Sequence, residues 1–373
     1  MASIYKRGKT WTYEVSYYEN GKKHKTTKGG FKRQTDAKNA AIEIESKKNT
    51  VGLSDSENIT FANYFKNWVE VYKVGKVSTG TELKYKTVVT MIENYFGNKL
   101  MKDVKKQEYQ KFIDEIAKTH VKDTVARFNG YIRRSLGDAL EDQITYRDFT
   151  RNIVISGSTE KLHPMNYLNE SEIAELKSYC EENYSLFDIS TAEILFGLLT
   201  GCRYGEVTGL TWDCVDFNQR TVDINKSYDY MYRTGFKPTK TKSSNRTISI
   251  NKDVYDLLKS INKQQSTLFL NQGYSNSDNF VFINNKHEVP SSNAVNKKLK
   301  SILNIIKSDN VITFHGLRHT HASMLIAKNV SLDYISERLG HADTSITSKI
   351  YIHLLKEKRE QENKKAINIL DNL

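Results

Sequence analysis

The chain has 373 residues, of which 38% are hydrophobic and 11% aromatic, too many for a disordered polypeptide. Its 56 Lys and Arg residues outnumber 44 Asp and Glu residues, and this net charge of +12 indicates either a polyanionic partner or a solvated, lysine-rich surface. Three widely spaced cysteines without a CxxC pair argue against a disulfide framework or a zinc ribbon. No secretory leader and no apolar run of about 18 residues is visible, so we expect a soluble cytoplasmic protein with no membrane partner.

Residues 1–50 are predicted to form a basic unit. They hold 12 Lys and Arg against 5 Asp and Glu, so a net +7 of the total +12 lies here. Residues 9–18 (KTWTYEVSYY) alternate as a strand does, Asn20-Gly21 marks a hairpin turn, and Lys23–Thr27 can return as the partner strand. With the alanine-rich helix that follows, the pattern predicts a small three-stranded sheet backed by one helix. Its basic side chains can contact DNA phosphates, and a solvated basic hairpin is the alternative.

Four apolar stripes at helical spacing follow a polar linker at residues 50–57 and predict a four-helix domain over residues 58–145. In order, the stripes are Phe61, Phe65, Trp68, Val69 and Tyr72; Val88, Ile92, Tyr95 and Phe96; Tyr109, Phe112, Ile113 and Ile116; and Phe128, Ile132, Leu136 and Leu140. We expect these side chains to form a core rather than a stacking platform. Residues 146–165 lack periodicity and contain Pro164, so they are predicted to be a second linker.

The remaining residues, 165–373, are predicted to form a mainly helical domain with a small sheet or hairpin. Asn169-Glu170-Ser171-Glu172 has the spacing of a capping box, and Ile194–Leu199 reads as a buried helix. A β-rich stretch, Thr221–Ile250, comes next, and helical patterns run to the C-terminus. The chain as a whole is therefore expected to be an α+β multidomain protein.

Two motifs in this last region place cations where they could meet a substrate. TGCRYGEV (residues 200–207) sets Arg203 between two glycines at the end of the buried helix, where its guanidinium can face a cleft. A C-capping surface arginine is the alternative. KPTKTKSSNRTI (residues 237–248) is predicted to form a β-hairpin with a lysine-rich tip, from which a lysine can donate a proton. A solvated or phosphate-contacting loop is the alternative for any one lysine.

A third motif, FHGLRHTH (residues 314–321), combines histidine and arginine on one helix face. His315 and Arg318 lie three residues apart, and together they suit a phosphodiester. The histidine can transfer a proton and the arginine can contact non-bridging oxygens. A zinc site is disfavoured because the HExxH glutamate and nearby cysteines are missing, so His319 and His321 are expected to be structural.

The fourth motif is Leu339-Gly340-His341, which is followed by Tyr351 ten residues after the histidine. Asp343 is placed to cap the helix that would carry Tyr351. A packing role is the alternative for a helical tyrosine in a chain with 22 tyrosines.

Taken in this order, the four motifs closely resemble those of the tyrosine recombinase, or phage integrase, family. The resemblance implies activating residues Arg203, Lys240, His315, Arg318 and His341, and a nucleophile at Tyr351. Lys240 is favoured over Lys242 because it opens the KT pair after the proline, as the family's lysine does. Gly316 departs from the aspartate that many members carry, which affects only local packing because the HxxR pair is intact.

The resemblance extends less specifically to the first two regions. It implies an arm-type DNA-binding domain at residues 1–50 and a SAM-like core-binding domain at residues 58–145, before a catalytic domain at residues 165–373. The implied function is a site-specific recombinase that integrates a phage or mobile element and, with an excision factor, removes it. The implied partners are double-stranded DNA at attachment sites, further copies in a synaptic homotetramer, an excisionase and a host DNA-bending protein at the bacterial nucleoid.

The expected chemistry is attack by Tyr351 on a DNA phosphodiester, giving a 3′-phosphotyrosine and a free 5′-hydroxyl. The arginines would neutralise the phosphate oxygens, His315 would accept the phenol proton, Lys240 would protonate the 5′-oxygen and His341 would hydrogen-bond the phosphate. Because the covalent link conserves the phosphodiester energy, no ATP is expected, and the sequence has no P-loop and no acidic metal cluster. We therefore expect no cofactor and no metal.

Other functions stay open at this point. A type IB topoisomerase-like enzyme or a chromosome-dimer resolvase would share the nucleophile, although the basic N-terminal sheet argues against the resolvase. A non-enzymatic DNA-binding regulator is a further alternative because residues 320–345 can pass as a helix-turn-helix. The tail, Leu354–Leu373, is charged and then apolar, which fits either docking on a neighbouring copy or packing on its own chain.

Overall fold

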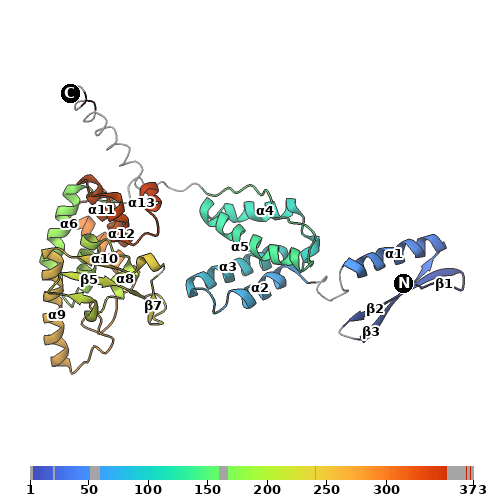
Figure 1. The fold of residues 1–373 in the computed structure, drawn as a ribbon, viewed down its shortest axis with the longest axis horizontal. Coiled ribbons are helices and arrows are strands. Elements are labelled where there is room, and N and C mark those ends of the chain that lie inside the picture. The colour runs from blue at the N-terminus through green and yellow to red at the C-terminus, as the bar shows by residue number, and fades with distance from the viewer. Residues whose placement is uncertain are drawn as a thin grey trace. The chain divides into compact units, whose positions relative to one another are not determined.

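The computed structural model describes residues 3–19, 22–50, 59–158, 167–239 and 241–350, together with Ile367 and Leu370. Its backbone contacts divide the chain into two compact units, residues 1–162 and 163–373. Figure 1 draws the helices and strands of each. The expected mixture of helices and small sheets is confirmed. In the described ranges, no helix is both long enough and apolar enough to cross a membrane.

The predicted N-terminal sheet and helix are confirmed. Strands β1 (Ser3–Arg7), β2 (Thr10–Glu19) and β3 (Lys22–Phe31) form an antiparallel sheet in the order β1-β2-β3, followed by helix α1 (Gln34–Thr50). Alternation along β2 buries Tyr13 and Val15 against Ala41 of the helix. The Asn20-Gly21 turn lies outside the described residues.

Four helices follow as predicted: α2 (Phe61–Tyr72), α3 (Thr79–Phe96), α4 (Lys106–Ala117) and α5 (Lys122–Glu141). Most of the predicted stripe residues are buried together in one core, rich in aromatic rings that meet edge to face. Tyr72 and Tyr95 are exceptions with 49% and 39% exposure, because each lies at the margin of its stripe. A short 3-10 helix, η2 (Met101–Asp103), joins α3 to α4.

The described part of the predicted linker, residues 146–158, forms no helix or strand, but it packs on the helical core. Phe149 is 2% exposed and packs edge to face on Phe61 in the helical core. The Ser158 N–H donates to the carbonyl of His120, 2.9 Å away. The segment shows no helical or strand period, yet Phe149 is buried in the bundle, and Ile153 and Ile155 pack against the same core.

The helices of the second unit surround its core. They are α6 (Glu170–Asn183), α7 (Ile189–Thr200), α8 (Tyr204–Thr208), α9 (Lys252–Gln272), α10 (Ser292–Ile305), α11 (Phe314–Ala327), α12 (Leu332–Leu339) and α13 (Thr344–Ile350). Helix α7 is buried along nearly its whole length, as predicted, and it contacts α6, α10 and α11. The predicted capping box at the start of α6 is confirmed, with Asn169 accepting from the Glu172 N–H and Glu172 accepting from the Asn169 N–H.

The strands of the second unit form two small antiparallel sheets. One has the order β4 (Val215–Asp216), β5 (Thr221–Ile224), β8 (Arg246–Ser249), and the other pairs β6 (Lys226–Tyr228) with β7 (Phe236–Pro238). The prediction that residues 237–248 form a hairpin is therefore wrong, because β7 and β8 belong to different sheets. The lysine-rich segment connects the two sheets through a 3-10 turn, η4 (Lys242–Ser244).

Candidate active site

Arg203 is held at the turn between the buried helix α7 and helix α8. Gly201 ends α7 with φ +69°, and an added Cβ would lie only 2.7 Å from Leu339 Cδ2, so glycine is required here. The Arg203 guanidinium donates to Glu206 Oε1 at 2.7 Å and to the Gly340 carbonyl at 3.2 Å. Its side chain keeps 30% exposure, so the cation is anchored but still reaches solvent.

Arg318 and His315 lie one turn apart on α11, as their spacing predicts. Arg318 is 3% exposed and bridges the ends of two helices. It donates to the Gly201 carbonyl at the end of α7, 2.9 Å away, and to the Leu339 carbonyl at the end of α12, 2.7 Å away. Burial, with the Arg203 charge nearby, lowers the pKa of Arg318 to about 10, so it stays charged at neutral pH. Burial also lowers the pKa of His315, helped by the Arg318 and Arg203 charges, so His315 is neutral.

His341 follows the left-handed Gly340 at the end of α12 and is oriented by a buried hydroxyl pair. Its Nδ1 lies 2.7 Å from Thr347 Oγ1, which lies 2.6 Å from Ser336 Oγ. Burial lowers the pKa of His341 to about 4, with the charges of Arg318 and Arg203 adding to the effect. The imidazole is therefore neutral at pH 7. Asp343 accepts from the Ser345 N–H at 2.7 Å, so the predicted cap of α13 is confirmed.

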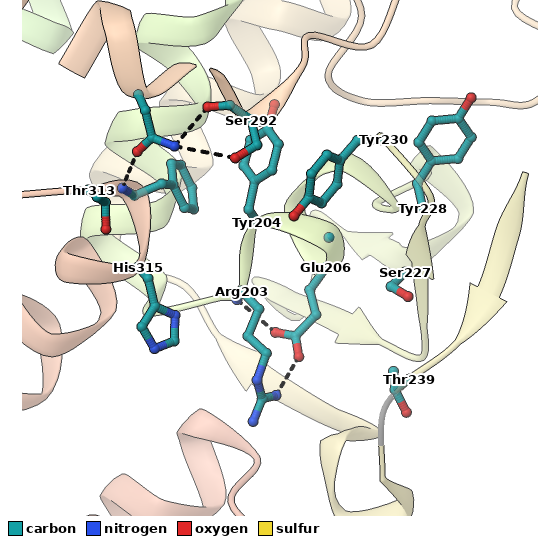
Figure 2. Close-up of a pocket in the computed structure, with 13 residues that line it drawn as sticks. Arg203, Tyr204, Glu206, Ser227, Tyr228, Tyr230, Thr239, Ser292, Thr313 and His315 are labelled. Carbon is teal, nitrogen blue, oxygen red and sulfur yellow. Dashed lines mark hydrogen bonds and ion pairs between the residues drawn. The ribbon is translucent and has the colours of Figure 1, made fainter. Parts of the chain in front are cut away.

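Arg203 and Arg318 meet at the adjacent carbonyls of residues 340 and 339, and His341 follows directly in the chain. The charges of both arginines also act on His315 and His341. A cavity of about 540 Å³ opens beside Arg203 and His315, and Thr239 lies on its rim. Figure 2 shows the Arg203 guanidinium turned towards Glu206, with the His315 ring beside it. Tyrosine rings, among them Tyr230, line the far wall of this cavity (Figure 2).

Lys240 and Tyr351 lie outside the described residues, and so does the side chain of Lys242. Their described neighbours do belong to the site. Thr239, before Lys240, lines the cavity, and Thr241, after it, lies 2.9 Å from the hydroxyl of Ser244, to which Arg203 also donates at 3.3 Å. Tyr351 follows the last described residue of α13, the helix whose Thr347 orients His341.

Sequence reasoning missed three groups that hold this site together: Glu206, Ser244 and Thr347. Glu206 is 4% exposed and accepts from both the backbone N–H and the guanidinium of Arg203. Its position three residues after Arg203, at a helix start, was the available signal, because a glutamate there often closes a capping box. The hydroxyls of Ser244 and Thr347 act across elements, and no local pattern marks them.

The remaining two histidines of the third motif have different surroundings. His321 is 3% exposed, its Nδ1 lies 3.0 Å from the Leu198 carbonyl, and its Nε2 accepts from Arg338 at 3.1 Å. It is a core histidine, as predicted. His319 meets His315 edge to face, with ring centroids 4.9 Å apart. In the described part of the chain, no group of three or more His, Cys, Asp or Glu side chains is placed to hold a metal ion.

The lowered pKa of His315 predicts the pH dependence of any reaction in which it serves as base. A base works in its neutral form, so activity is lost as the pH falls through its pKa, here below the ordinary value of 6.5. We expect the second-order rate constant of such a reaction to stay level down to pH 6.5 and to fall only below it. A pH series on wild type and His315→Gln checks this. An acid limb centred above pH 6.5, or one that survives in the variant, contradicts it.

The α+β fold and the convergence of these motifs define the tyrosine recombinase class of DNA breaking-and-rejoining enzymes. The chain belongs to the phage integrase family, which it matches over residues 166–358. It also matches an arm DNA-binding domain over residues 3–48 and the N-terminal SAM-like domain of phage integrases over residues 60–117.

Relatives are similar over most of their length. The integrase of Staphylococcus phage L54a is 25% identical over 86% of this chain and 96% of its own. A XerC-like tyrosine recombinase of Caldanaerobacter subterraneus is 25% identical over 99% of this chain and 97% of its own. Among solved structures, the Tn1549 transposon integrase in complex with transposon right end DNA has a TM-score of 0.64 at 17% identity, covering 81% of this chain and 99% of that one. The last likeness supports the fold.

Proposed function

We propose that this chain is a site-specific recombinase that integrates a phage or other mobile element through a 3′-phosphotyrosine intermediate on Tyr351, and that excises it with a partner factor. The observation that carries the proposal is that Arg203 and Arg318 meet at the adjacent carbonyls of residues 340 and 339, with His341 directly after them, and that the charges of both arginines act on His315 and His341. This set supplies positive charge and neutral imidazoles in one place, which is what a phosphodiester requires.

In the proposed reaction the Tyr351 phenol oxygen bonds to phosphorus while the bond from phosphorus to the 5′-oxygen breaks. A free phenol has a pKa near 10, so its proton must leave during attack, and neutral His315 accepts it. Lys240 donates a proton to the leaving 5′-oxygen. His341, if its Nδ1 accepts from Thr347, carries its proton on Nε2 and donates it in a hydrogen bond to the phosphate.

The proposed reaction needs neither a metal ion nor ATP. Arg203 and Arg318 would neutralise the charge that builds on the non-bridging oxygens, and the phosphotyrosine conserves the bond energy for rejoining. The reverse attack by a 5′-hydroxyl of the partner duplex restores the phosphodiester and frees the tyrosine.

The test is a nicked suicide DNA carrying the element's attachment site, on which the cleaved 5′ fragment diffuses away. The full chain is expected to form a protein–DNA adduct that resists SDS, with the same yield in excess EDTA. An adduct distinguishes the recombinase from a non-enzymatic regulator, and strand exchange between two duplexes distinguishes it from a type IB topoisomerase-like enzyme. Absence of any adduct would count against the proposal, and loss of the adduct in EDTA would show that a metal is needed.

We propose that the N-terminal sheet binds separate arm sites on DNA, because its strands carry basic side chains such as Lys6, Arg7 and Lys28. Binding of arm sites by the N-terminal sheet, in addition to the core site, favours an integrase over a resolvase. One nucleophile cuts one strand, so exchange of two duplexes needs four copies, and we propose a synaptic tetramer at the bacterial nucleoid. An excisionase and a host DNA-bending protein would set the direction.

Removal of residues 1–50 is expected to flatten the salt dependence of DNA binding. Each phosphate contact releases counterions and contributes about −0.9 to the slope of log K against log salt. The deleted segment carries a net charge of +7, so the slope should become less negative on DNA that contains the arm sites. Fluorescence anisotropy across a salt series measures it, with core-site DNA as control. An unchanged slope on arm-site DNA would show that the sheet makes no phosphate contacts.

A further inference from the structure

A third arginine, Arg246 on β8, is buried behind the site with its side chain 5% exposed. Its three donor nitrogens bind three different elements. Nη2 donates to Glu206 Oε2 at 3.0 Å, Nε donates to the Arg338 carbonyl at 2.6 Å, and Nη1 donates to the Ser244 carbonyl at 2.9 Å. All three nitrogens of this guanidinium bind protein acceptors, which suits Arg246 to holding these elements in place.

The bond from Arg246 to the Arg338 carbonyl is one of three arginine contacts at the C-terminal end of α12. The carbonyls of residues 338, 339 and 340 accept in turn from Arg246, Arg318 and Arg203. The last carbonyls of a helix have no partner within the helix and lie at the negative end of its dipole, so three guanidinium groups satisfy them well. His341 comes directly after this capped end.

The partners of Arg246 also reach the other parts of the site. The Glu206 carboxylate that it binds holds Arg203 as well. Ser244, whose carbonyl it binds, belongs to the turn after Lys240 and accepts from Arg203 through its hydroxyl. Gly340 is packed tightly against this network, since an added Cβ would lie 3.0 Å from Arg246 Nη1.

We propose that Arg246 is a positioning residue for strand cleavage. It locks the Glu206 carboxylate, the end of α12 and the turn that follows Lys240 into one arrangement, so that Arg203 and His341 are presented to the phosphate together. The inference rests on the proposed function. Like other groups that orient reacting side chains, Arg246 acts on geometry, where an error of about 1 Å can cost roughly 100-fold in rate.

Electrostatics supports this assignment. Burial alone would raise the pKa of Glu206, but the charge and hydrogen bond of Arg246, together with Arg203, hold it below its usual value. The other ionisable groups that interact with this carboxylate are Cys202 and Arg318. Without Arg246 the pKa of Glu206 should rise, and its protonation would loosen Arg203 as the pH falls.

The experiment compares full-length wild type, Arg246→Met and Arg246→Lys on the nicked suicide DNA. Arg246→Met is expected to bind the core site within about twofold of wild type but to cleave it about 100-fold more slowly at pH 7.5. Its rate should also fall as the pH decreases from 8 to 6.5, a range over which the wild-type rate stays level. Arg246→Lys keeps the charge but cannot donate to all three elements, so it should cleave about tenfold faster than Arg246→Met and still more slowly than wild type.

Two further variants separate positioning from general stability. Arg338→Met removes a nearby arginine whose side chain donates to His321 and to the Ser249 carbonyl, not to the site, and its pH profile should match wild type. In Arg246→Met with Glu206→Gln, the new pH dependence should disappear because the titrating carboxylate is gone.

Several outcomes would overturn the inference. One is a wild-type rate and pH profile for Arg246→Met, and another is an equal loss in Arg246→Met and Arg338→Met with unchanged profiles. If Arg246→Met fails to bind DNA, the inference is tested on Arg246→Lys instead. Cleavage by that variant at the wild-type rate would show that the hydrogen bonds from residue 246 to three elements are unnecessary. If wild type itself forms no adduct, the proposed function fails rather than this inference.

Discussion

Tyr351→Phe is expected to bind core-site DNA as wild type does and to form no covalent adduct. Only the phenol oxygen is removed, so the shape of the side chain and the charge of the site stay the same. Removing a nucleophile commonly lowers the rate by at least about 10⁴-fold, because water has no comparable approach to the phosphorus. Denaturing gels of a labelled suicide substrate measure the adduct, and anisotropy measures binding.

A second tyrosine provides the control. Tyr230 is one of the tyrosines that line the cavity beside Arg203 and His315, so it tests whether another phenol at this site can serve as nucleophile. Tyr230→Phe should keep adduct formation within a fewfold of wild type. If the Tyr351 variant still forms an adduct, the nucleophile lies elsewhere, and loss of the adduct in the Tyr230 variant alone would transfer the role to Tyr230. Mass spectrometry of the trapped peptide decides between the two positions.

Features set by neighbouring residues could be predicted from the sequence. Alternation over residues 9–18 predicted a strand, which the structure contains as β2, and the Asn169–Glu172 spacing marked a capping box that the structure also contains. Each of these depends on contacts within a few residues, where periodicity and capping chemistry determine the result.

Features set by distant residues could not be predicted in this way. Nothing near residue 246 indicates that its arginine meets Glu206, 40 positions earlier, or that Thr347 orients His341 across the start of α13. The pairing of β7 with β6 and of β8 with β5 was missed for the same reason, since either strand could have paired with the other on local pattern alone. Motif order identified the family, but the carbonyl cluster that unites the motifs required the fold.

Arg318→Lys is expected to lose about 10²- to 10³-fold in cleavage while core-site binding changes little. Arg318 uses two nitrogens on two carbonyls, Gly201 at the end of α7 and Leu339 at the end of α12. A single ammonium group cannot satisfy both, and removing one fixed donor from a site that stabilises developing charge commonly costs this much. The orphaned buried carbonyl should also lower the free energy of unfolding by about 1–3 kcal/mol, visible as a lower melting temperature.

The pH dependence of this variant separates loss of charge from loss of shape. Burial and the charge of Arg203 already lower the pKa of Arg318 to about 10, and the same surroundings would lower the pKa of a lysine further into the assay range. A lysine with a lowered pKa is charged below that pKa and neutral above it. Residual cleavage should therefore decrease as the pH rises from 7 to 9, a decline that wild type does not share.

Arg220→Lys is the matched control, because Arg220 lies over the Tyr255 ring at 5.1 Å and contacts no site residue in the described structure. It should cleave within about twofold of wild type with an unchanged pH profile. Cleavage by Arg318→Lys within tenfold of wild type would show that the two-carbonyl bridge does not position the cation for catalysis. A large loss without the alkaline decline would assign the effect to geometry alone, because the charge would then persist across the range. If the cleavage rate is lost and the residual rate also declines with rising pH, the site needs two things: the bridge between the two carbonyls, and a side chain that stays positively charged when it is buried.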